Sequence, residues 1–265
     1  METSAKLKAV LLGFHHVTAF AGGAQANLDF YRQRLGLRLV KKTVNYDDPA
    51  TYHFYYGDEL GSPGSLLTFF PWPTAPAGAE GSGQAIEIRF ALPHPDRGAN
   101  DPSGLRLQLA DAPAPKIESV TLRVADAEPT ARFLTEMLGF RDAGDGRFEL
   151  GGGIIQLVEA PGMPRAKLSS GMIHHIALRV ADDTAQDEWR AKLKGSGVRV
   201  TRVIDRQYFR SIYFREPGGV LFEIATDGPG FLIDEPADAL GSALKLPPWL
   251  EPVRESVERR LAGLE

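Results

Sequence analysis

The sequence predicts an α+β protein in which tandem βαβββ modules form two cupped, mixed sheets, with the second module truncated. Three observations support this fold class. A strand–helix–strand pattern recurs along the 265 residues, and 28 glycines with 19 prolines indicate many turns between short strands. No apolar run reaches the roughly 20 residues of a membrane helix. The length suffices to bury two ordinary cores.

Three complete copies of the module keep one register. Each copy opens with an alternating strand and an amphipathic helix that stops at a glycine. The strand and helix ranges are 14–20 with 26–35, 117–124 with 129–138, and 173–180 with 183–194. Twenty positions before the terminating glycines (Gly36, Gly139 and Gly195) stand His16, Ser119 and His175.

Further strands follow each helix, and one module lacks its middle. The expected later strands are 38–44, 51–59, 65–71, 147–150, 154–160, 198–205, 208–217 and 220–227. Residues 85–93 and 105–113 resemble the first and last strands of a module without its helix. We therefore expect a truncated second module between the first two complete copies.

These modules suggest three parts of the chain. Residues 1–113 hold the first and the truncated module, 114–230 hold the C-terminal pair of modules, and 231–265 form a tail. After Pro247 the tail has apolar residues at helical spacing: Leu250, Val253, Val257 and Leu261. We expect an amphipathic helix there that serves packing or dimer contacts.

The composition excludes several functional classes. The 30 basic and 34 acidic side chains leave a formal charge of −4, which does not favour nucleic acid or an anionic membrane as a partner. The absence of cysteine excludes disulfides, iron–sulfur clusters and a cysteine nucleophile. Together with the lack of a membrane segment, it leads us to expect a cytoplasmic protein.

Two histidine pairs open the first and last modules, His15-His16 and His174-His175. Because strand side chains alternate, His16 and His175 face the more polar side of their strands, and the other two face the apolar side. Two equivalent histidines converge on one point if the modules pack side by side, as a metal site requires. The alternative is that both pairs are merely tolerated on half-buried strands.

A third ligand could come from Glu223, which lies between Phe222 and Ile224 in an apolar strand. A buried carboxylate needs a cation, so the alternative to a metal is a buried arginine. The equivalent positions of the other modules are neutral: Thr68, Gln108 and Gln156. Two imidazoles and one carboxylate leave open coordination positions, as in Fe(II) oxygenases, although Mn(II) and Zn(II) accept the same donors.

With these residues, the chain resembles the vicinal oxygen chelate (glyoxalase/bleomycin resistance/extradiol dioxygenase) superfamily, and within it the hydroquinone-type ring-cleaving dioxygenases. The similarity covers nearly the whole chain and is most specific over 14–71, IHHIALRV at 173–180, and 205–231. It implies a non-haem iron held by His16, His175 and Glu223. It also implies a tyrosine and an arginine near the substrate, which fall on Tyr213 and Arg206.

The residues themselves allow two interpretations of each substrate-side group. The Tyr213 phenol could bond a substrate oxygen or move a proton, or it could simply fill the barrel mouth. Arg206 could stabilise an anionic oxygen, or it could pair with Asp205 at a surface turn.

Five other polar residues need an assignment, and four of them are histidines. Thr18 shares a strand face with His16 and must lie near any metal bound there. His15 and His174 are expected at most to neighbour the ligands, and His174 joins the candidate catalytic set. We expect His53 to be a structural strand residue and His94 to be a solvated loop residue.

We therefore predict a non-haem Fe(II) enzyme, with Mn(II) as the alternative metal, that opens a hydroquinone or related dihydroxylated aromatic by extradiol-type dioxygenation. The expected partners are a small aromatic substrate and O2, and the sequence is compatible with a homo-oligomer. The alternatives are a metal-dependent glyoxalase-like isomerase or hydrolase and a non-catalytic aromatic-binding protein. Because the candidate ligands come from the first and last modules, the truncated module should lie away from the metal.

Overall fold

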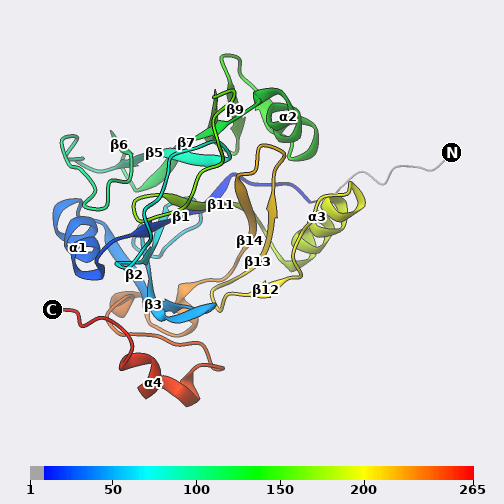
Figure 1. Ribbon diagram of the computed structural model, residues 1–265. Coiled ribbons are helices and arrows are strands. Elements are labelled where there is room, and N and C mark those ends of the chain that lie inside the picture. Colours follow the sequence, from blue (N-terminus) through cyan, green and yellow to red (C-terminus); the bar gives the residue numbers. More distant parts are fainter. Residues whose placement is uncertain (1–8) are drawn as a thin grey trace.

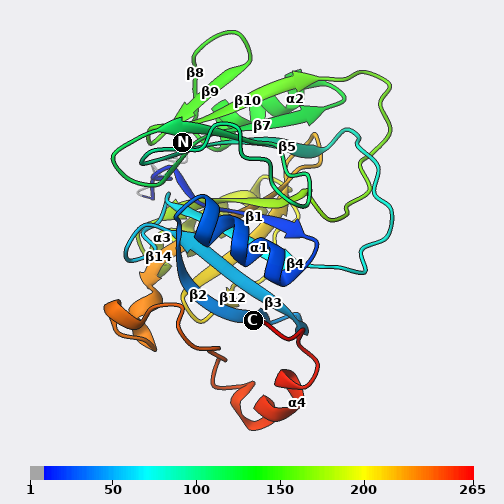
Figure 2. The same ribbon diagram turned by 90° about the vertical axis from the view of Figure 1, so that its left-hand side faces the viewer.

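The computed structural model describes residues 9–265, so the first eight residues of the expected 1–113 segment lie outside the described part. Two curled sheets make up the body, one stacked over the other (Figures 1 and 2). This arrangement confirms the predicted α+β fold of tandem modules in two sheets. No helix between residues 9 and 265 combines the length and the apolar character needed to cross a bilayer.

The larger sheet has eight strands. In spatial order they are β12 (Ile204–Asp205), β13 (Phe209–Arg215), β14 (Leu221–Pro229), β11 (Ile173–Val180), β1 (Phe14–Ala21), β4 (Leu66–Pro71), β3 (Asp48–Gly57) and β2 (Arg38–Asn45). The smaller sheet has the order β6 (Leu107–Asp111), β5 (Gln84–Leu92), β7 (Lys116–Val124), β10 (Gly153–Glu159), β9 (Arg147–Leu150) and β8 (Arg141–Asp142).

Each sheet joins two modules edge to edge through an antiparallel pair of opening strands. β1 pairs with β11 in the larger sheet, and β5 pairs with β7 in the smaller one. The first module therefore shares a sheet with the last, and the truncated module shares a sheet with the third. Each sheet draws strands from both 1–113 and 114–230.

The three predicted helices are present and begin near the expected residues. They are α1 (Ala24–Leu28) continued by the π-helical turn η1 (Asp29–Arg34), α2 (Ala127–Arg132) continued by η2 (Phe133–Met137), and α3 (Asp183–Gly195). Asp182 caps α3 because its side chain accepts a hydrogen bond from the amide of Ala185. Gly36 and Gly139 adopt the left-handed backbone that ends a helix, whereas after α3 this role falls to Gly197 rather than Gly195.

Two expected elements are shorter than predicted. Of the strand expected over 198–205, only β12 and an isolated bridge between Val200 and Phe214 form, and the amide of Tyr213 bonds to the Thr201 side chain instead of its carbonyl. The tail forms only the turn η5 (Glu251–Val253) and the helix α4 (Arg254–Glu258). Val257 is buried there, and Leu250 and Leu261 pack beside it, but Val253 is 49% exposed, so the predicted apolar stripe is buried only in part.

Packing and ion pairs attach the remaining parts to the sheets. One buried cluster runs through both sheets, with members such as Val17 and Ile88. The short helical turns η3 (Phe231–Ile233) and η4 (Ala237–Ala239) follow β14. Lys41, fully buried in β2, is 2.5 Å from a carboxylate oxygen of both Asp234 and Glu235. These ion pairs fasten the segment after β14 across the larger sheet.

Candidate metal centre

Three side chains from three strands converge inside the larger sheet. The Nε2 atoms of His16 and His175 are 3.1 Å apart, and the Oε2 atom of Glu223 lies 3.5 Å and 2.9 Å from them, respectively. All three residues are buried, and among the described residues they form a group whose ligand-type atoms lie within 4.8 Å of one another. The structure thus brings together the three residues that were predicted to meet.

Strand register explains this convergence. His16 on β1 and Glu223 on β14 both lie opposite Ala177 of β11, one on each side. His175 is two residues earlier on β11 and therefore faces the same way, with Thr18 as its partner on β1. The small Ala177 side chain leaves room between the two neighbours, so the three functional groups can meet.

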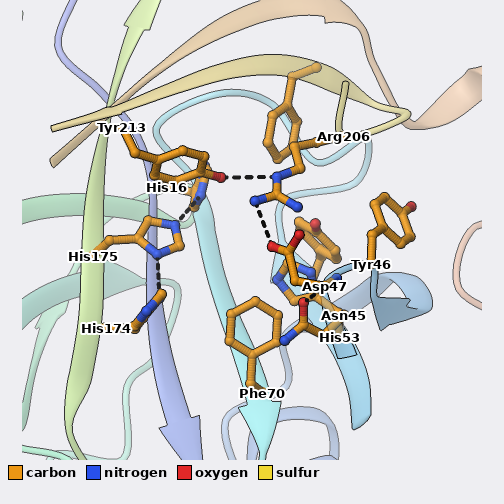
Figure 3. Close-up of a pocket in the computed structure, with 12 residues that line it drawn as sticks. His16, Asn45, Tyr46, Asp47, His53, Phe70, His174, His175, Arg206 and Tyr213 are labelled. Atoms are coloured by element: carbon orange, nitrogen blue, oxygen red, sulfur yellow. Dashed lines mark hydrogen bonds and ion pairs between the residues drawn. The ribbon is translucent and has the colours of Figure 1, made fainter. Parts of the chain in front are cut away.

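In each histidine pair, the first histidine contacts the Nδ1 atom of the candidate ligand, the ring nitrogen that does not face Glu223. The Nδ1 atoms of His15 and His16 are 2.9 Å apart. Those of His174 and His175 are 2.8 Å apart, as Figure 3 shows for this second pair. Burial lowers the pKa of both His15 and His174 to about 3, so these rings are neutral near pH 7 and can accept a hydrogen bond. Both Nε2 atoms of the candidate ligands are left facing Glu223.

The Glu223 carboxylate fits a bound cation. Its Oε1 atom accepts a hydrogen bond from Ser211, whereas its fully buried Oε2 atom has no hydrogen-bond partner among the described residues. Burial by itself would raise the pKa of Glu223, but the neighbouring His16 and His175 outweigh it and hold the pKa well below its usual range. An ionised carboxylate oxygen beside two imidazole nitrogens is the donor set of a divalent metal with open positions.

A cavity lies against His16 and His175, two of these three side chains (Figure 3). Its walls are largely aromatic and include Tyr55, Phe70 and Phe209, while His174 and Arg206 add polar edges. An aromatic ligand can pack its flat ring against these walls, and the polar groups at one end can bind its oxygen atoms. The cavity therefore suits a small aromatic ligand that carries oxygen atoms.

Tyr213 and Arg206 both reach this cavity, as predicted. The Nε atom of Arg206 donates to the Tyr213 hydroxyl at 3.2 Å, and the Tyr213 ring lies 5.7 Å from that of His175. Arg206 forms its ion pair with Asp47, at 2.9 Å, so the alternative of a surface pair with Asp205 is wrong. Burial and the nearby Glu223 charge raise the pKa of Tyr213, so the phenol keeps its proton at neutral pH.

A chain of polar side chains extends from the candidate ligands into β4 and β3. The Thr18 hydroxyl is 3.0 Å from Nε2 of His175 and 2.7 Å from the hydroxyl of Thr68. The Thr68 hydroxyl is in turn 2.9 Å from Nε2 of His53, which lines the cavity. Sequence reasoning treated His53 as structural, although its face parity with Tyr55 could have indicated the cavity. His94 lies exposed in a loop, as expected.

Comparisons with known proteins identify the family of the chain. A model of the Glyoxalase/Bleomycin resistance protein/Dioxygenase superfamily matches residues 13–94 and 116–224. The chain is 36% identical to "Putative ring-cleaving dioxygenase MhqO" of Bacillus subtilis (strain 168), over 96% of this chain and 97% of that protein. It is 32% identical to the chlorohydroquinone/hydroquinone 1,2-dioxygenase of Sphingobium indicum, over 94% and 95% of the two chains.

Solved structures agree at the level of the fold. The crystal structure of a "putative dioxygenase" from Bacillus subtilis subsp. subtilis str. 168 superposes with a TM-score of 0.88 at 36% identity, covering 97% of this chain and 98% of the other. Glyoxalase I from Zea mays superposes with a TM-score of 0.58 at 16% identity, covering 83% and 93% of the two chains. This second likeness extends to the fold alone.

Proposed function

Since this chain belongs to the glyoxalase/bleomycin resistance protein/dioxygenase superfamily, we propose that it is an Fe(II)-dependent enzyme that opens a hydroquinone or a related dihydroxylated aromatic ring with O2. Relatives named as ring-cleaving or hydroquinone dioxygenases, at 32% to 37% identity, support an enzyme of the dioxygenase type. The observation that carries the proposal is the buried Glu223 oxygen without a hydrogen bond, facing two imidazole nitrogens beneath an aromatic cavity.

In this proposal His16, His175 and Glu223 hold the metal, and His15 and His174 fix the orientation of the two imidazoles through their Nδ1 contacts. A bound Fe(II) ion would supply Lewis acidity toward a ring hydroxyl and a path for electrons between the ring and O2. The remaining work falls to the side chains around the cavity.

Those side chains orient the aromatic ring of the substrate, transfer a proton and stabilise negative charge. Tyr55, Phe70 and Phe209 orient the aromatic ring and exclude water from the cavity. Tyr213, held protonated, donates a hydrogen bond to an oxygen of the substrate and can transfer that proton. Arg206 stabilises negative charge that develops on the same side, since its guanidinium already contacts the Tyr213 hydroxyl.

The test is oxygen uptake together with ultraviolet monitoring of ring loss, on protein loaded with Fe(II) under anaerobic conditions. We expect stoichiometric O2 consumption with hydroquinones and less with catechols, and unchanged rates in the control variant His94→Ala, whose side chain is exposed. Substrate turnover without O2 consumption would instead indicate an isomerase or hydrolase. Tight binding of the aromatic without ring opening would indicate a binding protein, and either result contradicts the proposal.

A further inference from the structure

A second cavity lies behind His174 and His175, outside the aromatic cavity. It opens between the start of β5 in the smaller sheet and β11 with β14 in the larger one. The side chains that matter for its chemistry are Gln84, Arg165, Leu168, His174, Arg215 and Leu221. His174 and His175 line both cavities and so form the wall between them.

Two arginines meet at one turn on the rim of this cavity. Arg165 donates from Nη1 to the carbonyl of Gly218 at 3.2 Å, and Arg215 donates from Nη1 to the carbonyl of Gly219 at 2.7 Å. Within residues 9–265 neither guanidinium forms an ion pair with a carboxylate. Two adjacent positive charges without a counter-ion are a favourable place for an anion.

The turn that carries these carbonyls is held from within by Glu216. Its buried carboxylate accepts hydrogen bonds from the Thr130 hydroxyl and from the backbone amides of Gly218 and Val220. The negative charge of Glu216 is therefore engaged inside the turn, and most of the arginine donors are left for another partner.

The Arg165 guanidinium has a space shaped for it by two glycines. A Cβ atom at Gly83 would lie 2.2 Å from Nη1 of Arg165, and one at Gly219 would lie 1.4 Å from the same atom. Both glycines also have positive φ angles, +71° and +100°. Any side chain at either position would displace the guanidinium, so the backbone keeps Arg165 at the cavity rim.

Gln84, which lines the cavity, has a polar atom without a partner. It is only 6% exposed, and its buried Oε1 atom accepts no hydrogen bond from the described residues. Buried polar atoms in proteins nearly always have a partner, so this side chain indicates a missing ligand group. Apolar Leu168, Ile173 and Leu221 line the cavity as well.

We propose that this cavity binds a small organic carboxylate. The carboxylate group pairs with Arg165 and Arg215, the hydrocarbon body packs against the leucines and Ile173, and a hydroxyl group of the ligand donates to Gln84. The apolar lining favours a carboxylate over inorganic phosphate. This inference does not depend on the proposed ring-cleaving function.

Isothermal titration of the full chain with hexa-2,4-dienoate tests the proposal. Metal-free protein should bind this probe and should bind its uncharged amide at least tenfold more weakly. Arg165→Gln and Arg215→Gln should each weaken binding about tenfold, since each removes one charge-assisted contact. Arg97→Gln, which removes an exposed arginine on a distant loop, is the matched control and should bind like the original chain.

A second titration tests Gln84. We expect 6-hydroxyhexanoate to bind several-fold more tightly than hexanoate, and this advantage should vanish in Gln84→Leu while hexanoate binding is kept. The proposal is overturned if the acids bind only after metal is added, if inorganic phosphate binds as tightly as the acids, or if both arginine variants bind like Arg97→Gln.

Discussion

The two sheets place their central strands in the same register, yet within the described residues three ligand-type side chains gather only on the larger sheet. The matching pairs across the central strands are His16–Ala177 and Thr18–His175 in the larger sheet, and Glu87–Thr121 and Arg89–Ser119 in the smaller one. The outer partners correspond as well, with Gln156 standing where Glu223 stands. The two sheets therefore share the same strand pairing, and they differ in the side chains at the matched positions.

The two sheets differ in how well their inner faces are shielded from water, as well as in the metal-ligating side chains that they carry. In the larger sheet β2, β3 and the turns near Asp47 and Arg206 close the cup, and all three candidate ligands are buried. The truncated module offers only β5 and β6, so the corresponding face of the smaller sheet is a polar hollow with half-buried Ser119 and Gln156. A buried metal site thus needs both the donors and a complete module to exclude water.

The largest difference between the two sheets should come from changing the charge at the matched positions Glu223 and Gln156. Glu223→Gln removes the only anionic candidate ligand, so Fe(II) retained after dialysis should fall to background, as in His16→Ala and His175→Ala. Gln156→Glu adds a carboxylate at the equivalent position of the smaller sheet and should leave metal content unchanged. Elemental analysis of dialysed protein measures both, and full occupancy in Glu223→Gln would refute the ligand assignment.

The truncated module should matter as much for stability as the complete one. Phe90 of β5 and Phe69 of β4 are both almost fully buried in the common core. Each change to alanine should lower the free energy of unfolding by about 3–5 kcal/mol in urea titrations. Val158→Ala, at a 41% exposed position of β10, is the control and should cost less than about 0.5 kcal/mol. A negligible effect of Phe90→Ala would show that β5 is dispensable.

Tyr213 and the residue at the equivalent position of the smaller sheet allow a catalytic role of Tyr213 to be distinguished from a packing role. Tyr213 lies opposite Glu223, and Arg147 lies opposite Gln156 at the equivalent place in the smaller sheet. Tyr213→Phe should slow turnover about a hundredfold with the metal retained, because a proton donor is lost. Arg147→Ala should leave kcat unchanged. A Tyr213→Phe enzyme with undiminished kcat would assign the tyrosine to packing.

Regular patterns made the fold and the candidate ligands predictable. The glycine spacing and the strand alternation are local properties, and they placed His16, His175 and Glu223 on faces that the register later joined. Contacts between distant segments that no repeated pattern relates were not predictable. The Asp47–Arg206 ion pair joins two hairpin turns, and its members carry no local signal of each other.

The two shortened elements show the same limit. Residues 198–205 alternate as a strand should, but the Thr201 side chain replaces a ladder bond to Tyr213. The tail stripe is helical in spacing, and Leu250, Val257 and Leu261 do pack against the body, yet the helix is short and Val253 stays exposed. Local spacing alone does not fix how far an element extends, because tertiary contacts also contribute.

Acid should destabilise the larger sheet selectively. Burial and the neighbouring His16 lower the pKa of His53 well below its usual value, so the folded protein keeps this ring neutral while the unfolded chain binds a proton below about pH 6.5. Stability is therefore unaffected by His53 above that pH and falls below it, by on the order of 1 kcal/mol per pH unit. His53→Gln should flatten the fall between pH 6.5 and 5 in metal-free protein.

The exposed His94 gives the control for this titration, since His94→Gln should leave the curve unchanged. Hydrogen exchange at pH 5 should show β3 and β4 opening before β7 and β10, which carry no histidine. Parallel stability curves for His53→Gln and the original chain would contradict the assignment of His53 as a buried neutral ring.

The smallest effect concerns the ion pair that closes the larger cup. Asp47 holds Arg206 at 2.9 Å, but its side chain is 70% exposed, so the pair should contribute at most about 1 kcal/mol. Asp47→Asn should lower kcat/KM about two- to fivefold with metal content kept, because Arg206 is less firmly held against Tyr213. Asp48→Asn is the matched control, since Asp48 bonds to Thr51 in its own turn. A loss as large as that of Tyr213→Phe would mean that closure of the cup by these two turns, and not the phenol alone, distinguishes the larger sheet from the smaller.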